Sequence, residues 1–426
     1  MSESIIDQSA RRGWAWVPSL YFAEGLPYAI VLTVSVVMYK SMGVGNAEIS
    51  FYTSWLYLPW VVKALWSPFI DIVSTKRRWI LLMQCGIAIA LATVAVAVAT
   101  DGFFAASLAA FWVMSFLSAT HDIAADGFYM YGLTERAQSW WVGLRTTFYR
   151  LALLAAQGGI VALAGYFELS HQPGTAWRLT FMVAAILFGL LALWHSYALP
   201  RPADDHPRRV AASAVWREVA DTFVEFFKKK HLVTALAFML LYKLAEAQLV
   251  KMIAPFLLDS PDAGGLGLST VRVGLTYGTI GLCALMGGGI AGGFVAARYG
   301  LRRCMMPMAW SMSLTCVTFV VLAMVHDPSV WFVDVCVALE QAGYGFGTTA
   351  YTLYLLNFSA GARRTSFYAI CTGIMALGMM VPGMWAGWLQ EAVGYTSFFI
   401  FTMLCCTTTI VVAHMANRSI SNETYN

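Results

Sequence analysis

The sequence predicts an all-α, polytopic membrane protein in which twelve transmembrane helices form two six-helix bundles. Of its 426 residues, 59% are hydrophobic and only 12% are charged, about half the charged share of a soluble domain. So few charges cannot cover a water-exposed surface, and most of the surface must therefore face lipid. Apolar runs long enough to cross a bilayer recur along the chain, and short motifs of the first half return in the second.

Charged or Gly-, Pro- and Asp-containing loops separate the apolar runs, and a polar stretch divides them into six and six. The polar N-terminus has no small-residue cleavage site after an apolar core, so we expect the first helix to direct insertion. The expected spans are 14–38, 49–70, 79–100, 103–131, 139–166, 177–199, 232–258, 270–297, 303–325, 330–357, 366–390 and 395–416.

Basic residues gather on one side of these spans, which predicts that both termini lie in the cytoplasm. Only Lys40, Arg178 and Arg272 fall on the opposite side, each at a helix edge. The nineteen expected on the cytoplasmic side are Arg11, Arg12, Lys76, Arg77, Arg78, Arg136, Arg201, Arg208, Arg209, Arg217, Lys228, Lys229, Lys230, Arg298, Arg302, Arg303, Arg363, Arg364 and Arg418.

The domain division follows from the polar stretch: residues 1–199 form the first bundle, 200–230 a cytoplasmic connector and 231–426 the second bundle. We interpret 200–230 as a solvated connector; the alternative is that 213–227 form an amphipathic helix on the inner leaflet. Because the basic residues lie in short, scattered clusters, they do not form the contiguous face that nucleic-acid binding requires.

Three motifs repeat at offsets of 222, 225 and 219 residues. YFAE ending at Glu24 matches KLAE ending at Glu246, KRR at 76–78 matches LRR at 301–303, and TTFYR at 146–150 matches TSFYA at 365–369. Such a duplication in a six-plus-six topology predicts two parallel repeats around a midplane cavity, which is the major facilitator arrangement.

Acidic residues in the first and fourth spans are the candidates for proton coupling. An ionisable side chain at membrane depth costs about 2.5–3.5 kcal/mol and therefore faces the bundle interior. Glu24 precedes Gly25 and Pro27, and the proline leaves a carbonyl unpaired one turn earlier. Asp122 and Asp126 lie four residues apart on one helix face and repel each other unless a proton or a cation intervenes.

Basic side chains offer a second explanation for these acids and also candidate substrate contacts. Asp122 with Lys63, or Asp126 with Arg145 or Arg150, would be a static buried ion pair. Lys243 and Glu246, three residues apart in the seventh span, could pair with each other. The alternative is that Lys243 contacts an anionic group of the substrate. The candidate substrate-binding residues are Lys63, Lys243, Glu24, Glu246, Tyr149 and Arg150, and the coupling candidates are Asp122, Asp126, Glu24 and Glu246.

The loops after the second and eighth spans are the candidates for gating. Asp71 ends the second span ahead of the basic run KRR, and LRR follows the eighth span. This arrangement resembles the motif between the second and third helices of major facilitators, and the resemblance implies a latch on the cytoplasmic gate. The gating candidates are Asp71, Arg77, Arg78, Arg302 and Arg303.

No catalytic constellation is present in the sequence: it has no Walker loop, no GxSxG and no HExxH motif. The eight cysteines show no metal-site spacing and mostly lie in apolar runs. We therefore expect no enzyme, no cofactor and no metal. The expected partners are lipid, protons and a small-molecule substrate, and the expected state is a monomer.

Four motifs, in the order of the helices that carry them, resemble those of AmpG-type muropeptide permeases, a branch of the major facilitator superfamily. They are FAEGLP at 22–27, VKALWSPFID at 62–71, SATHDIAADGF at 118–128 and YKLAEA at 242–247. The resemblance spans all twelve helices. The residues that match the family pattern are Lys63, Asp71, Asp122, Asp126 and Lys243.

The resemblance implies proton-driven import of cell-wall breakdown products across the bacterial inner membrane: N-acetylglucosamine–1,6-anhydro-N-acetylmuramic acid compounds, with or without peptide. Glu24 stands where many relatives have a small residue, and Ala245-Glu246 replaces Gly-Asp, which leaves two alternatives. One is import of a siderophore or another amphipathic anion. The other is a membrane sensor or scaffold, against which the buried charges argue because nothing would repay their burial.

Overall fold

The computed structural model describes residues 12–207, 212–361 and 363–423, and all regular structure in these residues is helical. Packing divides the chain into two compact units. The first contains the chain up to Ser35 together with Leu65–Glu218, and the second contains Val36–Ala64 together with the chain from Val219 onward. Arg11, Arg208 and Arg209 of the predicted cytoplasmic set lie outside the described residues.

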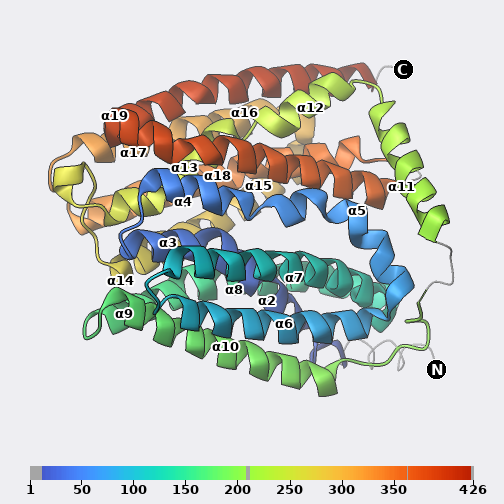
Figure 1. Ribbon diagram of the computed structural model, residues 1–426. Coiled ribbons are helices and arrows are strands. Elements are labelled where there is room, and N and C mark those ends of the chain that lie inside the picture. Colours follow the sequence, from blue (N-terminus) through green and yellow to red (C-terminus); the bar gives the residue numbers. More distant parts are fainter. Residues whose placement is uncertain (1–11, 208–211, 362, 424–426) are drawn as a thin grey trace. The chain divides into compact units, whose positions relative to one another are not determined.

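Figure 1 labels the helices along the chain. The elements up to the connector are α2 (Val17–Ala29), η1 (Ile30–Val34), α3 (Ser35–Ser41), α4 (Asn46–Trp55), α5 (Leu58–Val73), α6 (Lys76–Ala97), α7 (Phe103–Gly132), α8 (Glu135–Leu154), η2 (Ala155–Ile160), α9 (Val161–Glu168) and α10 (Pro173–Ala198). After them come α11 (Ala212–Phe227), α12 (Leu232–Leu241), α13 (Leu244–Leu258), η3 (Pro261–Ala263), α14 (Thr270–Val273), η4 (Gly274–Gly281), α15 (Leu282–Tyr299), α16 (Leu301–Thr315), α17 (Val317–Met324), α18 (Val330–Phe358) and α19 (Arg364–Glu423).

The described helices account for the twelve predicted spans. Nine helical stretches among these residues are long and apolar enough to cross a membrane. One of them, Arg364–Ile420, holds two predicted spans, because Gly394 with φ +77° breaks α19 and only glycine adopts that conformation without strain. The other two spans are α18 and the pair α4–α5, which is interrupted between Trp55 and Leu58. The predicted all-α polytopic fold is confirmed.

Several spans contain a π-helical segment: η1 in the first, η2 in the fifth and η4 in the eighth. η1 follows Pro27, which lies inside α2 and removes a backbone donor there. Segments of this kind are frequent at functional sites because they widen one helical turn and redirect the side chains after it.

The connector contains a helix, α11. Val215 and Phe226 on it are buried, at 4% and 0% exposure, whereas Trp216 and Phe227 are about half exposed. Phe226 packs in a core cluster with Phe238, and its ring lies 5.8 Å from that of Phe367. Residues 213–227 therefore form an amphipathic helix with one face packed on protein and the other exposed, and the assignment of 200–230 as a cytoplasmic connector stays a prediction.

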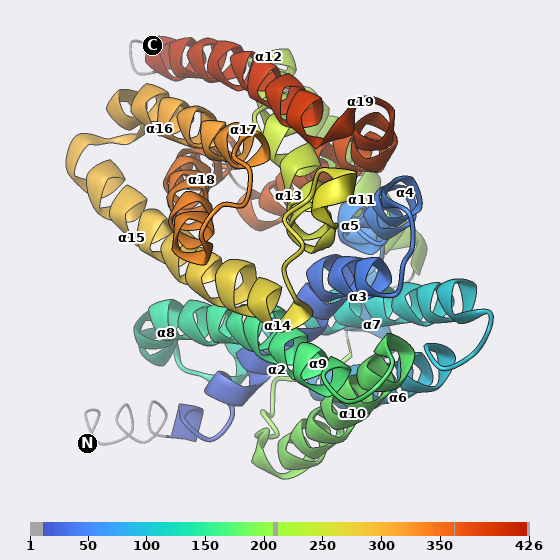
Figure 2. The ribbon, with the colours of Figure 1, turned by 90° about the vertical axis from the view of Figure 1, so that its left-hand side faces the viewer.

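In the first unit, α6 packs between α7 and α10, and α2 packs on α8 (Figure 1). In the second unit, α15 packs along α18, and α13 and α4 both pack on α19; Figure 2 shows α15 beside α18. The division into six-helix bundles at 1–199 and 231–426 stays a prediction, since the packing places Val36–Ala64 with the second unit.

Candidate functional site

The first unit holds a carboxyl pair formed by Glu24 of α2 and Asp122 of α7. Glu24 is 8% exposed, its carboxyl group lies within hydrogen-bonding reach of Asp122, and its Oε2 has no hydrogen-bond partner among the described residues. Gly25 allows α2 to approach α8 closely, since a Cβ there would lie 2.7 Å from the carbonyl oxygen of Tyr149. Two carboxylates in apolar surroundings cannot both stay ionised at low cost, so the pair favours binding a proton.

Asp126, one turn after Asp122, has a cation as its partner. The Nη1 of Arg145 on α8 lies 2.9 Å from Oδ1 of Asp126 and donates a hydrogen bond of 2.7 Å to the hydroxyl of Tyr21. The guanidinium also lies 4.8 Å from the ring centroid of Tyr129. Of the two arginines that the sequence offered to Asp126, the structure selects Arg145, so one member of the predicted carboxylate pair is ion-paired.

A buried polar chain runs behind Asp122 through four helices of the first unit. Gln84 of α6 contacts Nε2 of His121 at 2.9 Å and Nδ1 of His195 at 2.9 Å, and Nε2 of His195 lies 2.9 Å from Oγ of Ser19. Gln84 and both histidines are 0% exposed. Because Gln84 contacts one nitrogen of each ring, it ties α7, the helix that carries Asp122, to α10.

We expect Gln84→Leu to lower the free energy of unfolding by about 2–4 kcal/mol, because it leaves two buried imidazole nitrogens without partners. Thermal unfolding of the purified protein in detergent measures this. Gln172→Leu is the control, since Gln172 is exposed and its side chain makes no cap hydrogen bond. Equal unfolding temperatures for the two variants would show that this chain of hydrogen-bonded side chains does not stabilise the first unit.

The second unit contains two buried lysines. Lys243, just before α13, is 7% exposed; its Nζ lies 5.0 Å from the ring centroid of Tyr351 and 3.4 Å from the hydroxyl of Tyr344, to which it donates. Lys251, two turns later, is 2% exposed and donates a 2.8 Å hydrogen bond to Oγ1 of Thr53. Both ammonium groups contact aromatic rings and hydroxyl groups, which leaves them suited to an anionic group of a ligand.

Glu246 lies one turn after Lys243 and is 1% exposed. The two charges interact, but neither carboxylate oxygen of Glu246 has a hydrogen-bond partner among the described residues. Its carboxyl neighbour is Glu340 of α18, which the motif analysis missed. Glu340 could have been found, because it is an ionisable residue inside the predicted span 330–357.

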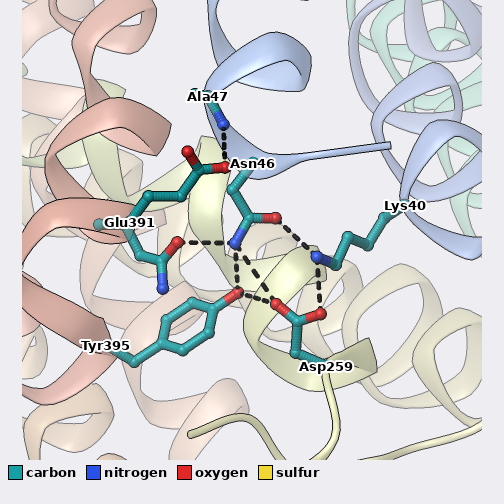
Figure 3. A network of polar contacts seen from close by, with 7 residues as sticks. Lys40, Asn46, Ala47, Asp259, Glu391 and Tyr395 are labelled. Carbon is teal, nitrogen blue, oxygen red and sulfur yellow. Dashed lines mark hydrogen bonds and ion pairs between the residues drawn. The ribbon is translucent and has the colours of Figure 1, made fainter. Parts of the chain in front are cut away.

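A second polar network lies at the start of α4 and was also missed (Figure 3). Nζ of Lys40 lies 2.6 Å from Oδ1 of Asp259 and donates a 2.8 Å hydrogen bond to Oδ1 of Asn46. The amide of Asn46 donates to Oε1 of Gln390 at 2.7 Å and to the hydroxyl of Tyr395 at 2.9 Å. This network ties the segment Val36–Ala64 to α13 and α19 within the second unit.

Glycines of α19 allow the segment Val36–Ala64 to pack directly against the backbone of α19. A Cβ added at Gly387 would lie 1.9 Å from the carbonyl oxygen of Asn46, one at Gly373 would lie 2.7 Å from that of Val61, and one at Gly383 would lie 2.9 Å from Oγ of Ser54. Close helix approach is thus a geometric requirement at Gly387 in particular.

The predicted gating residues occupy different surroundings. Arg77 donates to the carbonyl oxygens of Ser196 and Leu199, and its backbone N–H donates to Asp205, so it ties the start of α6 to the end of α10. Arg302 and Arg303 are exposed in the first turn of α16, and Arg78 begins α6. The side chain of Asp71 in α5 lies outside the described part of the structure. Their gating role stays a prediction.

The remaining predicted substrate contacts fall in both units. Tyr149 of α8 packs beside Tyr28 with ring centroids 6.3 Å apart and is electrostatically coupled to Glu24 and Asp122. Arg150 follows it in α8, and Lys63 lies in α5 within the second unit. Among the described residues, no three His, Cys, Asp or Glu side chains are grouped so that they could hold a metal ion.

A family model described as Major Facilitator Superfamily matches residues 19–381, most of the chain. The protein belongs to the major facilitator superfamily. The chain is 25% identical to the anhydromuropeptide permease of Escherichia coli K12, over 95% of this chain and 82% of the relative. It is also 25% identical to a Rickettsia conorii protein named as a transporter, AmpG 4, over 94% of this chain and 96% of that one. These similarities support the resemblance to AmpG-like permeases.

Solved structures agree on the fold. A D-xylose–proton symporter aligns with a TM-score of 0.72 at 9% identity, covering 96% of both chains. The nucleoside transporter NupG, as its D323A mutant, aligns with a TM-score of 0.69 at 17% identity, covering 94% of this chain and 98% of that one. At such identities the likeness establishes the major facilitator fold alone.

Proposed function

We propose that this protein is a proton-coupled symporter that imports anhydro-muropeptides, N-acetylglucosamine–anhydro-N-acetylmuramic acid with or without peptide, across the bacterial inner membrane. Both termini are then cytoplasmic, as the distribution of Lys and Arg predicts. The observation that carries the proposal is the carboxyl pair Glu24–Asp122 next to the ion pair Asp126–Arg145, inside a membrane-spanning unit.

The proton would bind between Glu24 and Asp122. When the pair binds one proton, its net charge changes from −2 to −1. The positive charge of the neighbouring Arg145 then neutralises Asp126 alone. When the proton leaves, the carboxylates repel each other and compete for the guanidinium. Arg145 already contacts Asp126 and Tyr21, so a change of partner needs only a small side-chain movement. Proton binding thus changes which contacts hold α2, α7 and α8 together.

The substrate class is supported by the relatives named as AmpG proteins and by the cations of the second unit. Muropeptides carry a lactyl or peptide carboxylate and sugar hydroxyls. Lys243 and Lys251 are buried beside tyrosines and Thr53, and we propose that one of them or Lys63 binds the carboxylate. Tyr149 and Arg150 are proposed to contact the sugar from the first unit, and Glu246 is proposed to carry a proton.

Uptake of radiolabelled anhydro-disaccharide into proteoliposomes, with and without an inward-directed proton gradient, tests the function. We expect accumulation only with the gradient, and collapse when a protonophore is added. Equal uptake in both conditions would exclude proton coupling. Accumulation of a ferric siderophore in place of the disaccharide would show that the substrate class is wrong.

We expect Lys243→Met to raise the apparent KM for the anhydro-muropeptide at least tenfold, a change of about 1.4 kcal/mol, because it removes a buried cation from a carboxylate ligand. Lys243→Arg keeps the charge and should lie between wild type and Lys243→Met. The same proteoliposome assay measures both. An unchanged KM in Lys243→Met would assign Lys243 to packing against Tyr344 and Tyr351 alone.

A further inference from the structure

The second unit contains a carboxyl pair formed by Glu246 of α13 and Glu340 of α18, of which the proposed mechanism uses only Glu246. Both side chains are enclosed, with Glu246 1% and Glu340 0% exposed. The two carboxyl groups lie close enough to interact directly. Each belongs to a helix of the membrane-spanning second unit. Glu246 is part of the motif YKLAEA at 242–247, whereas Glu340 lies outside all four motifs on which the family resemblance rests.

The oxygens of this pair are poorly satisfied. Nε2 of Gln341 donates a 2.8 Å hydrogen bond to Oε2 of Glu340. Oε1 of Glu340 and both oxygens of Glu246 have no partner among the described residues. Buried carboxylate oxygens without donors cost several kcal/mol in general. A proton placed between the two groups supplies the missing hydrogen bond and removes one negative charge.

The groups around the pair bring one positive charge. Lys243 acts on Glu246 from the same helix, while Tyr277 of η4, Cys316 beside α16 and Cys406 of α19 face the pair from the other elements packed on it. These three are neutral donors or weak acids at neutral pH. Two ionised glutamates with Lys243 would leave a net charge of −1, whereas one added proton makes the cluster neutral.

The internal repeat places this pair in correspondence with the pair of the first unit. Glu24 and Glu246 are related by the repeat offset of 222 residues, and Asp122 and Glu340 are 218 residues apart, close to the same offset. Each unit therefore pairs an acid on the first helix of its repeat with an acid on the fourth helix. This correspondence is independent of the contacts around Glu246 and supports a common task for the two pairs.

We propose that Glu246 and Glu340 share one proton and form a second proton-binding site of the transporter. The role of this site in the transport cycle rests on the proposed proton coupling. The protonation of the site does not depend on that coupling. Release of the proton leaves two repelling carboxylates on α13 and α18, and Lys243 is the cation that lies within reach of one of them. Proton loss would then draw Lys243 away from Tyr344 and Tyr351 toward Glu246.

Infrared difference spectroscopy of the purified protein at neutral pH tests the proposal without any transport. A protonated buried carboxyl group gives a C=O stretching band that shifts in D₂O. We expect such a band in protein that carries Asp122→Asn, which removes the carboxyl pair of the first unit, and its loss when Glu246→Gln, Glu340→Gln or both are added. Asp327→Asn is the matched control, because Asp327 is exposed in the turn before α18, and it should leave the band unchanged.

Three outcomes would overturn the proposal. A band that persists in both Gln variants would belong to another group. The absence of a band in the Asp122→Asn protein would show that both glutamates are ionised. A band that disappears on adding Na⁺ would show a sodium site instead. A band assigned to Glu246 and Glu340 in a protein whose uptake ignores the proton gradient would refute the proposed coupling but leave the proton site intact.

Discussion

Asp122→Asn is expected to abolish gradient-driven accumulation of substrate while the protein stays folded in the membrane. The amide has nearly the volume of the carboxyl group and can donate a hydrogen bond to Glu24, so the contact between α2 and α7 is kept. What is lost is the repulsion between two carboxylates, and with it the reason for the site to bind a proton in one state and release it in another.

The measurement compares accumulation with counterflow in proteoliposomes. Counterflow exchanges labelled for unlabelled substrate without net proton movement, and we expect Asp122→Asn to retain it. Asp101→Asn is the control, because Asp101 is exposed in the turn before α7 and should accumulate substrate as the wild type does. Wild-type accumulation by Asp122→Asn would remove Asp122 from the coupling mechanism.

Asp126 should respond differently from Asp122, although the sequence treats them as a pair. Its side chain is 55% exposed and ion-paired with Arg145. Asp126→Asn removes the ion-pair partner of Arg145. The guanidinium of Arg145 can then interact with Glu24 and Asp122, which stabilises their ionised forms. In the proposed mechanism, therefore, Asp122 belongs to the proton-binding pair and Asp126 positions Arg145.

The spans could be predicted because each one needs only an uninterrupted apolar run between polar loops. The predicted first span, 14–38, corresponds to helical residues Val17–Ser41, and the predicted seventh, 232–258, has the observed limits. The π-helical segments such as η1 could not be predicted, since a single wide turn leaves the hydrophobic pattern unchanged. The grouping of Val36–Ala64 with the second unit depends on packing and is equally invisible in the sequence.

Candidate site residues could be predicted where a single charged residue inside an apolar run was the signal. They were missed where the site depends on a contact between residues far apart in the sequence. Glu24, Asp122 and Glu246 stand out as charges within apolar runs, and Glu340 satisfies the same criterion and also fits the repeat offset. Lys40 and Asp259 gave no such signal, because charged residues at helix edges are ordinary. Only the folded chain brings both to Asn46.

The segment Val36–Ala64 packs with the second unit although the chain on both sides of it belongs to the first. Its contact with α19 is closest at Gly387, where a Cβ would lie 1.9 Å from the carbonyl oxygen of Asn46. A backbone oxygen cannot rotate away as a flexible side chain can, so any larger residue must push α4 from α19. The same displacement breaks the hydrogen bonds of Asn46 to Gln390 and Tyr395.

We therefore expect Gly387→Leu to expose the packed face of α4. Ser54 on that face is 0% exposed, so Ser54→Cys reports the displacement through its reaction with a membrane-impermeant maleimide. The measurement uses protein in which the exposed Cys85 and Cys283 are replaced by serine. Labelling should be at least about tenfold faster in Gly387→Leu, which corresponds to about 1.4 kcal/mol lost from the closed contact.

Gly293→Leu is the matched control, because Gly293 is also helical and in the second unit but a Cβ there meets no atom within 4 Å. It should leave the labelling rate of Ser54→Cys at the background value. If Gly387→Leu also left the rate there, the α4–α19 contact would have to accommodate a side chain by a local shift that keeps Ser54 covered. In that case α4 would stay on α19 and the hydrogen bonds of Asn46 would remain intact. The network of Lys40, Asn46 and Asp259, rather than the glycine contact, would then hold the segment to the second unit.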